Sequence, residues 1–274
     1  MAHTANNAVD LIDSRRDQFL RSIPGLTGVA GVLVSDEKNL VFTSNRGEET
    51  IGVFEQGKEA SVEKVKVGGR PNGLAFDPSR ETLLAANVPR PDDAGPVTVS
   101  IVDVKQRAMV GDLRVPGRTR WTVFDPETDR FYVNIAEPAQ ITIVETKERA
   151  SIVGRYPIPA VGPHGLDIDH KGRQLFCASD DAHLFRVDLE SGKVSKAGDL
   201  AGAPDVIFFN PRLDHLYVAI GSPGVIQVFD TERLKEVQRV STEPGTHTIA
   251  FNHETSKVYA LFPESHRASI YADN

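Results

Sequence analysis

The chain contains few of the residues that cross-link a fold or carry it through a membrane. It has one Cys, one Trp and two Met among 274 residues. A single cysteine excludes an internal disulfide, and Cys177 lies in the apolar run LFCAS, where we expect a buried small hydrophobe. No apolar run approaches the roughly 18 residues of a membrane-spanning helix.

Several sequence motifs are also missing. The chain has no GxGxxG, GxxxxGK[ST], GxSxG or CxxC motif, and its basic residues do not alternate with aromatics along a strand. The formal net charge of −7 disfavours nucleic acid and anionic membranes as partners. We therefore expect neither a nucleic acid nor a membrane as partner.

The N-terminal stretch MAHTANNAVDLIDS lacks the basic-then-apolar pattern of a secretion signal. For the chain as numbered this predicts a cytoplasmic location. The alternative is an exported or periplasmic protein whose N-terminus is truncated or mature.

The most informative feature present is a repeat of about 42 residues. An acidic residue ends a short apolar run seven times, at intervals of 42, 48, 42, 43, 42 and 43 residues. Self-similarity at this period is typical of repeat architectures. The seven positions are Asp13, Glu55, Asp103, Glu145, Asp188, Asp230 and Asp273.

Each repeat is predicted to form four short strands. The unit GPHGLDIDHKGRQLFCASDDAHLFRVDLESGKVSKAGDL holds four apolar or alternating runs separated by turn residues. Four antiparallel strands in 40–45 residues are typical of a β-propeller blade. The sequence predicts an all-β fold and a single propeller domain over residues 1–274.

The number of blades depends on how the two ends of the chain pair. First strands are predicted six times, near Gly31, Gly73, Trp121, Gly165, Val206 and Thr248. Fourth strands are also predicted six times, near residues 17–22, 62–67, 108–113, 151–156, 194–199 and 236–241. We therefore expect six blades, with QFLRSIP as the outer strand of the last blade and one spare third strand, 8–13 or 268–273. The alternative is seven blades.

The start of each first strand is expected to line one mouth of the propeller channel. Aligning the units on the residue that ends this strand gives one residue, five positions earlier, in each blade. Five of these six residues are polar, and they come from different blades. The set is Ala30, Asn72, Arg120, His164, Asp205 and His247.

These residue types suit a metal. Two imidazoles, a carboxylate and an amide oxygen can ligate a divalent ion, so Asn72, His164, Asp205 and His247 are the predicted ligands. The expected cofactor is one divalent metal, which could be zinc, manganese, iron or calcium, acting as a Lewis acid or on a bound water. The alternative is a solvated channel mouth that binds ordered water.

Catalytic roles follow from the same set. Asp205 is predicted as both a ligand and a possible base, and Arg120 would orient an anionic group. A carboxylate bound to metal is a poor free base, so Asp180 or Asp181 could fill that role. Trp121 would form an apolar wall.

Loops between second and third strands are expected to rim the same mouth. The longest, residues 88–96, contains three prolines and could form a partial lid. The other rim residues are Asn45, Arg46, Asn87, Glu137, Asp180, Asp181, His183, Glu264 and His266, together with His3 in the partial first unit. In contrast, His170, His215 and His253 fall in or beside turns at the opposite end and are interpreted as structural.

The units resemble the YVTN-type, or YncE-like, propeller repeat. The matching segments are RPNGLAFDPSRETLLAAN, HLYVAIGSPGVIQVFDTERLKEVQRV and NNAVDLIDSRRDQFLRSIP, and together the units cover nearly the whole chain. This resemblance implies the fold, while its members include both binding scaffolds and a few lyases.

PNGLAFDPSRETLLAAN is also similar to a segment of the six-bladed SMP-30/gluconolactonase-like group. That resemblance implies a divalent metal at the top of the channel, with Asn72 and Asp205 in ligand positions. Ala30 stands where the group has a glutamate. A lyase that holds zinc through several histidines is a third possibility.

The sequence therefore predicts a metal-dependent enzyme acting on a small polar or anionic substrate, either a lactonase-like hydrolase or a lyase. The alternative is a non-catalytic YncE-like scaffold that binds a protein or peptide.

Overall fold

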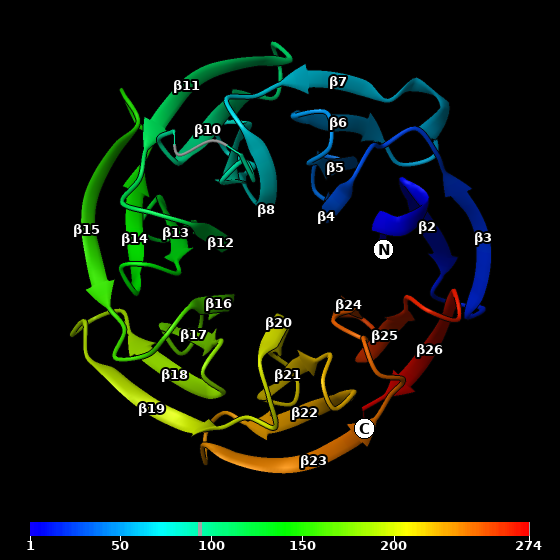
Figure 1. Cartoon of the computed structure of the whole chain (residues 1–274), viewed down its shortest axis with the longest axis vertical. Helices are drawn as coiled ribbons and strands as arrows, with labels where there is room; N and C mark the ends of the chain where they lie inside the picture. The colour runs from blue at the N-terminus through cyan, green and yellow to red at the C-terminus, as the bar shows by residue number, and fades with distance from the viewer. Residues whose placement is uncertain (93–94, 274) are drawn as a thin grey trace. The chain divides into compact units, whose positions relative to one another are not determined.

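The computed structural model describes residues 1–92 and 95–273. In this part of the chain, β-strands and two three-residue 3-10 helices, η1 (Thr4–Asn6) and η2 (Glu59–Ser61), make up the regular structure (Figure 1). No helix among the described residues has the length and apolar character needed to cross a membrane. The chain separates into two compact units.

One unit comprises Ala2–Asp13 and Phe19–Arg155. Its strands form four antiparallel sheets in which chain order is also spatial order. The first residue of β3, Gln18, and the last two of β15, Tyr156 and Pro157, are assigned to the other unit. The sheets are β1 (Ala2–His3), β2 (Ala8–Asp13) and β3 (Gln18–Ile23); β4 (Val29–Ser35), β5 (Leu40–Asn45), β6 (Thr50–Glu55) and β7 (Glu63–Lys66); β8 (Arg70–Asp77), β9 (Thr82–Val88), β10 (Thr98–Asp103) and β11 (Ala108–Arg114); and β12 (Thr119–Asp125), β13 (Arg130–Ile135), β14 (Gln140–Glu145) and β15 (Ser151–Pro157).

The other unit comprises Met1, Ser14–Gln18 and Tyr156–Asn274. It holds three further antiparallel sheets. They are β16 (Pro163–Asp169), β17 (Gln174–Ser179), β18 (His183–Asp188) and β19 (Val194–Asp199); β20 (Pro204–Asn210), β21 (His215–Ile220), β22 (Val225–Asp230) and β23 (Lys235–Ser241); and β24 (Thr248–Asn252), β25 (Lys257–Phe262) and β26 (Arg267–Ala272).

The sheets number seven in the described residues, so the expectation of six blades is wrong and the seven-bladed alternative is confirmed. The strand containing QFLRSI pairs with β2 in the first sheet, and the last sheet is made of β24, β25 and β26 alone. The error came from requiring a first strand in every blade. The first sheet forms without one, because its members correspond to the second, third and fourth strands of other blades.

Six of the seven repeated acidic residues end a strand and Asp273 follows one, and Asp103, Asp188 and Asp230 cap the turn that comes next. Asp103 accepts the N–H of Gln106 at 2.8 Å, and Asp230 accepts that of Arg233 at 2.8 Å. Asp and Asn stabilise tight turns by such side-chain-to-backbone bonds. The residues that end the first strands act in the same way, as when Asp77 accepts the N–H of Ser79 at 2.9 Å.

The hydrophobic core lies between consecutive sheets within each unit. Phe42 of β5 packs against Phe76 of β8, with ring centroids 4.8 Å apart, and Phe176 of β17 packs against Phe209 of β20 at 5.7 Å. Full burial of one such side chain contributes about 1.5–3 kcal/mol. Cys177 is fully buried in this core, as predicted.

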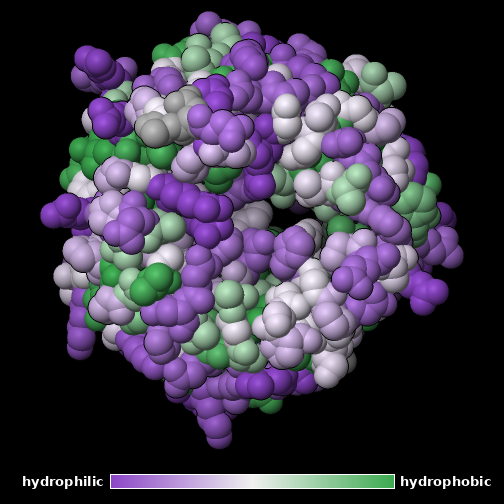
Figure 2. Space-filling model, viewed as in Figure 1, coloured by the Kyte–Doolittle hydropathy of each residue, from purple (hydrophilic) through white to green (hydrophobic). Residues whose placement is uncertain are grey.

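The face shown in Figure 2 is mostly hydrophilic, with apolar residues scattered between polar ones. Large exposed apolar side chains occur mainly on fourth strands, such as Phe19 on β3 and Val110 on β11. Single exposed apolar residues are normal on protein surfaces.

Candidate functional site

The residues predicted at the strand starts lie at local irregularities of the sheets. Five first strands shift register against their second strands at this point, for example between Pro163 and Gly165 in β16 and between Pro204 and Ile207 in β20. Such bulges re-aim a side chain out of the regular alternation. His164 and Asp205 lie within these two shifts, and the bulges therefore set the directions of both side chains.

The strands β16 and β20 approach each other closely beside these residues. A Cβ added to Gly165 would lie 2.7 Å from the carbonyl oxygen of Asp205 and 2.8 Å from the side chain of Ile207. Contacts under 3.0 Å are essentially never seen for real Cβ atoms. A glycine after His164 is therefore what brings the backbone of Asp205 to this distance.

The result is a row of three side chains, with the His164 imidazole between the carboxylates of Asp180 and Asp205. His164 Nδ1 lies 2.7 Å from Asp180 Oδ1, and His164 Nε2 lies 3.3 Å from Asp205 Oδ1. The His164 side chain is 14% exposed, against 32% for Asp180 and 28% for Asp205. The ring is thus mostly enclosed while both carboxylates reach solvent. All three residues belong to one compact unit.

The two carboxylates determine where the His164 ring carries its protons. A carboxylate can only accept, so the ring donates from Nδ1 to Asp180. The second carboxylate, at Nε2, favours a proton there as well, because two lone pairs facing each other would repel. With both carboxylates ionised, this arrangement favours a ring that donates to Asp180 and to Asp205.

The loop between β17 and β18 places Asp180. The Asp180 N–H donates to the Gly162 carbonyl at 2.9 Å, and a Cβ on Gly162 would lie 2.5 Å from the Asp180 carboxylate. Gly162 has a φ of +65°, a left-handed conformation that side-chain-bearing residues rarely adopt. Replacing this glycine would displace the carboxylate.

Asp181, the other predicted base, is engaged in the same loop. Its carboxylate accepts the Ser179 hydroxyl at 2.6 Å and the Val161 N–H at 3.0 Å. Partial burial raises the pKa of Asp181, but these hydrogen bonds and nearby His183 outweigh it and hold the pKa below its usual range. Asp181 is therefore an ionised structural anchor and a poor proton acceptor.

Asp167 is a residue of this region that the sequence reasoning missed. Its carboxylate accepts the Phe209 N–H at 2.7 Å and the Ile168 N–H at 2.9 Å, and so joins β16 to β20. Burial raises the pKa of Asp167 to about 7, against the smaller opposing effect of these bonds. The sequence does carry a signal for it: Asp167 is charged, whereas the corresponding positions of the other first strands are apolar. Those positions hold Leu33, Ala75, Val123, Phe208 and Ala250.

The four predicted metal ligands are divided between the two units. Asn72 lies in the other unit, where its Oδ1 accepts a hydrogen bond from the Arg46 guanidinium. A cation already against this oxygen opposes a metal there. His247 is exposed, precedes β24, and donates from Nδ1 to the Gly245 carbonyl at 2.6 Å.

His164 and Asp205 are thus the two predicted ligands that the structure brings together. Nowhere in residues 1–92 and 95–273 do three His, Cys, Asp or Glu side chains form a group that could hold a metal. Protein metal sites of the predicted kind use three or four protein ligands. His164 and Asp205 alone fall short of this number, and the predicted metal stays a prediction.

Arg120 and the predicted lid belong to the other unit. Arg120 lies in the register shift of β12, as its position in the repeat predicts, and its carbonyl oxygen would lie 2.6 Å from a Cβ on Gly73. Its role toward a substrate stays a prediction. The predicted lid, 88–96, includes residues 93 and 94, which lie outside the described residues.

The histidines interpreted as structural lie in or beside turns, as expected. His215 begins β21, and its Nδ1 donates to Asp273 at 2.7 Å. Tyr217 donates to the same carboxylate oxygen at 2.7 Å. His253 packs edge-on against Phe251, with ring centroids 4.7 Å apart.

Comparisons with known proteins agree with the fold. A family model described as "Lactonase, 7-bladed beta-propeller" matches residues 7–108, less than half of the chain. Among curated proteins, none matches the sequence. The chain is a β-propeller protein with seven antiparallel blades.

Two solved structures are similar over almost the whole chain. Hydrazine synthase from Kuenenia stuttgartiensis aligns with a TM-score of 0.86 at 12% identity, covering 98% of this chain and 90% of that one. A functionally unknown protein from Desulfotomaculum acetoxidans DSM 771 aligns with a TM-score of 0.81 at 10% identity, covering 99% and 90%. At these identities the likeness shows the fold alone.

Proposed function

We propose that the protein is a hydrolase that opens a small lactone or related ester at the site formed by Asp180, His164 and Asp205. The observation that carries the proposal is one imidazole held between two carboxylates at 2.7 and 3.3 Å. The match of residues 7–108 to a lactonase propeller model supports the substrate class.

The three groups can supply both proton transfers of ester hydrolysis. Asp205, partly open to solvent, takes a proton from a water whose oxygen forms a bond to the ester carbonyl carbon. The bond from that carbon to the alkoxide oxygen then breaks, and His164 gives its Nε2 proton to the alkoxide. Asp205 returns its proton to His164, so an acid and an alcohol are formed from the ester and one water.

Asp180 acts through His164 in this scheme. By accepting the Nδ1 proton it fixes the orientation of the ring and stabilises its positive charge. Such a carboxylate is a positioning residue, and its loss is expected to cost less than the loss of His164 or Asp205.

The test is a hydrolysis screen over five- and six-membered lactones, neutral and carboxylate- or phosphate-bearing, followed by acid release. We expect turnover of at least one class, reduced by about 10²–10⁴ in kcat for His164→Gln and Asp205→Asn. His215→Gln is the matched control, because His215 makes the same 2.7 Å contact to a carboxylate in the same unit.

Equal activity of wild type and His164→Gln would overturn the proposal, as would equal losses in His164→Gln and His215→Gln. Metal dependence stays a separate prediction. Elemental analysis of protein purified without chelator, beside His164→Gln and Asp205→Asn, tests it without relying on activity.

A further inference from the structure

Asp167 is a charged residue at a position of the first strand that the other blades fill with apolar side chains. The equivalent residues include Leu33 on β4 and Phe208 on β20. Leu33 packs against the apolar cluster that contains Phe76 of β8, and the Phe208 and Phe251 rings lie 6.4 Å apart between centroids. In those blades this position therefore makes an apolar contact with the first strand of the next blade.

The carboxyl group of Asp167 makes a hydrogen bond where those blades make an apolar contact. It accepts the Phe209 N–H of β20 at 2.7 Å and the Ile168 N–H of its own strand at 2.9 Å. The strand β20 lies at an edge of its sheet, and edge strands carry N–H groups that their own sheet leaves unpaired. Asp167 therefore links two blades by a directional bond, which an apolar contact does not supply.

The fold alone does not require a carboxyl group at this position. Burial raises the pKa of Asp167 to about 7, which means that its surroundings disfavour the charged form. The other first strands have Leu, Ala, Val or Phe here. What distinguishes β16 and β20 from the other first strands is that they carry His164 and Asp205, whose side chains meet.

The link and the contact between His164 and Asp205 join the same two strands at different heights. Asp167 follows His164 by three residues and Phe209 follows Asp205 by four, so the two contacts lie about 10 Å apart at roughly 3.3 Å per residue. Between them, β16 and β20 approach closely at Gly165. A hydrogen bond beyond this approach fixes the angle between the strands and hence their separation at His164.

The contact between His164 and Asp205 is sensitive to this separation. Its 3.3 Å between Nε2 and Oδ1 lies just beyond the usual range of about 2.7–3.2 Å for an N–H···O hydrogen bond. A small further separation of the strands would therefore break it. The 2.7 Å contact from Nδ1 to Asp180 is made within one blade, to the loop between β17 and β18, and does not depend on where β20 lies.

We propose that Asp167 is a positioning residue of the His164 site, whose hydrogen bond with the Phe209 N–H holds β20 against β16 and keeps Asp205 within reach of His164 Nε2. Its effect on turnover rests on the hydrolysis proposed above. Both forms of a carboxyl group keep an oxygen that can accept this N–H, so the role does not require one protonation state.

The test compares wild type with Asp167→Leu, which supplies the side chain of Leu33, and with Asp167→Asn, which keeps an acceptor oxygen. The readout is the pair of imidazole ¹⁵N signals of His164, which needs no substrate. We expect Asp167→Leu to shift the Nε2 signal in the same direction as Asp205→Asn and to leave Nδ1 protonated. Asp167→Asn should shift Nε2 less, because its amide oxygen can still accept the Phe209 N–H.

Steady-state kinetics give the second readout, with a lactone that the wild type turns over. Asp167→Leu should lower kcat by about 10- to 100-fold and change KM by less than about twofold, because the reacting groups are misplaced while substrate binding is kept. Asp167→Asn should recover most of this loss.

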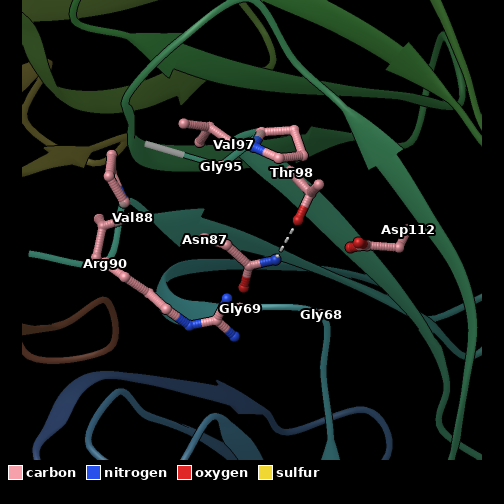
Figure 3. Close-up of a pocket in the computed structure, with 11 residues that line it drawn as sticks. Gly68, Gly69, Asn87, Val88, Arg90, Gly95, Val97, Thr98 and Asp112 are labelled. Atoms are coloured by element: carbon pink, nitrogen blue, oxygen red, sulfur yellow. Dashed lines mark hydrogen bonds between the residues drawn. The ribbon is translucent and has the colours of Figure 1, made fainter. Parts of the chain in front are cut away.

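Asn87→Ala is the matched control for a loss of stability. Asn87 is also a buried side chain with two hydrogen bonds, to Thr98 and Ser100 at 2.9 Å each, beside a cavity of about 130 Å³ in the unit without His164 (Figure 3). Like Asp167→Leu, it should lower the urea midpoint. In contrast, both His164 signals and kcat should stay as in wild type.

An unchanged Nε2 signal in folded Asp167→Leu would overturn the positioning role, as would an equal change of that signal in Asn87→Ala. Should Asp167→Leu not fold, Asp167→Asn decides by the same signal. Failure of the proposed function gives a different result. In that case no lactone is turned over, while a response of Nε2 to Asp167→Leu still supports the positioning of His164 against Asp205.

Discussion

Two histidines in the same unit each donate from Nδ1 to a carboxylate at 2.7 Å, yet their surroundings differ. His164 lies at a bulge and has a second carboxylate, Asp205, 3.3 Å from Nε2. His215 begins a regular strand and shares Asp273 with the Tyr217 hydroxyl. A histidine–carboxylate pair alone therefore does not define a reactive site. The difference between His164 and His215 is that a second carboxylate lies near Nε2 of His164.

The second pair belongs to a buried structural network. Asn210 donates to the Tyr217 hydroxyl at 2.8 Å, and that hydroxyl donates to Asp273, which follows the last strand. Burial raises the pKa of Tyr217 above its usual range, so the hydroxyl stays protonated and remains a donor. This network ties the sheet β20–β23 to the end of the sheet β24–β26.

Replacing His164 and His215 by glutamine, one at a time, should give the largest difference between the two regions, in kcat and in stability. His164→Gln is expected to lower kcat for lactone hydrolysis by about 10²–10⁴ while retaining the fold, because the proton donor is lost. His215→Gln should keep kcat and lose on the order of 1 kcal/mol of stability. Steady-state kinetics and urea unfolding on both variants check this, and the reverse pattern would contradict the comparison.

Gly165→Ala tests whether the close approach of β16 and β20 makes the His164 environment. The added Cβ would lie 2.7 Å from the Asp205 carbonyl oxygen, so the strands must separate at a cost of about 1–3 kcal/mol. Activity should fall with stability. Gly111→Ala is the control, since its Cβ would meet nothing closer than 3.6 Å; similar unfolding curves for the two variants would count against the role of Gly165.

Tyr217→Phe probes the structural region alone. Removing the hydroxyl leaves Asn210 and Asp273 without that partner and should cost about 1–2 kcal/mol, measured as a shift in the urea midpoint at constant m-value. Lactone hydrolysis should stay within twofold of wild type. A large loss of kcat would show that this network also supports the reaction.

A pH-dependent effect concerns Asp167, which lies on the same strand as His164. Its pKa rises from 3.8 to about 7 on folding, so the folded state holds more protons between these values. Stability therefore falls as pH rises from about 4 to 7, by up to about 1.4 kcal/mol per pH unit. Asp167→Asn should remove this dependence; parallel stability curves for both proteins from pH 5 to 8 would refute it.

Local chemistry made much of the fold predictable. Asp103 and Asp230 end their strands because they cap turns with their own side chains, and such signals depend on neighbouring residues. The first-strand positions of His164 and Asp205 followed from the same period. The blade count was wrong because it depends on which strand β3 pairs with, and an apolar strand near a chain end does not encode its partner.

The contacts between blades were less predictable for a similar reason. The 3.3 Å approach of His164 to Asp205 depends on two bulges and on Gly165, none of which is visible as a motif. The Arg46 contact to Asn72 likewise joins residues 26 positions apart in neighbouring sheets. Sequence reasoning identified candidate residues, whereas packing decided which of them meet.

The most direct test of the central comparison is the ¹⁵N chemical shifts of the two imidazole nitrogens in His164 and His215 at neutral pH. The account predicts that His164 carries protons on both nitrogens, and that Asp205→Asn converts it to a ring protonated at Nδ1 alone, with His215 unchanged. A neutral His164 whose ring signals do not respond to Asp205→Asn would contradict it.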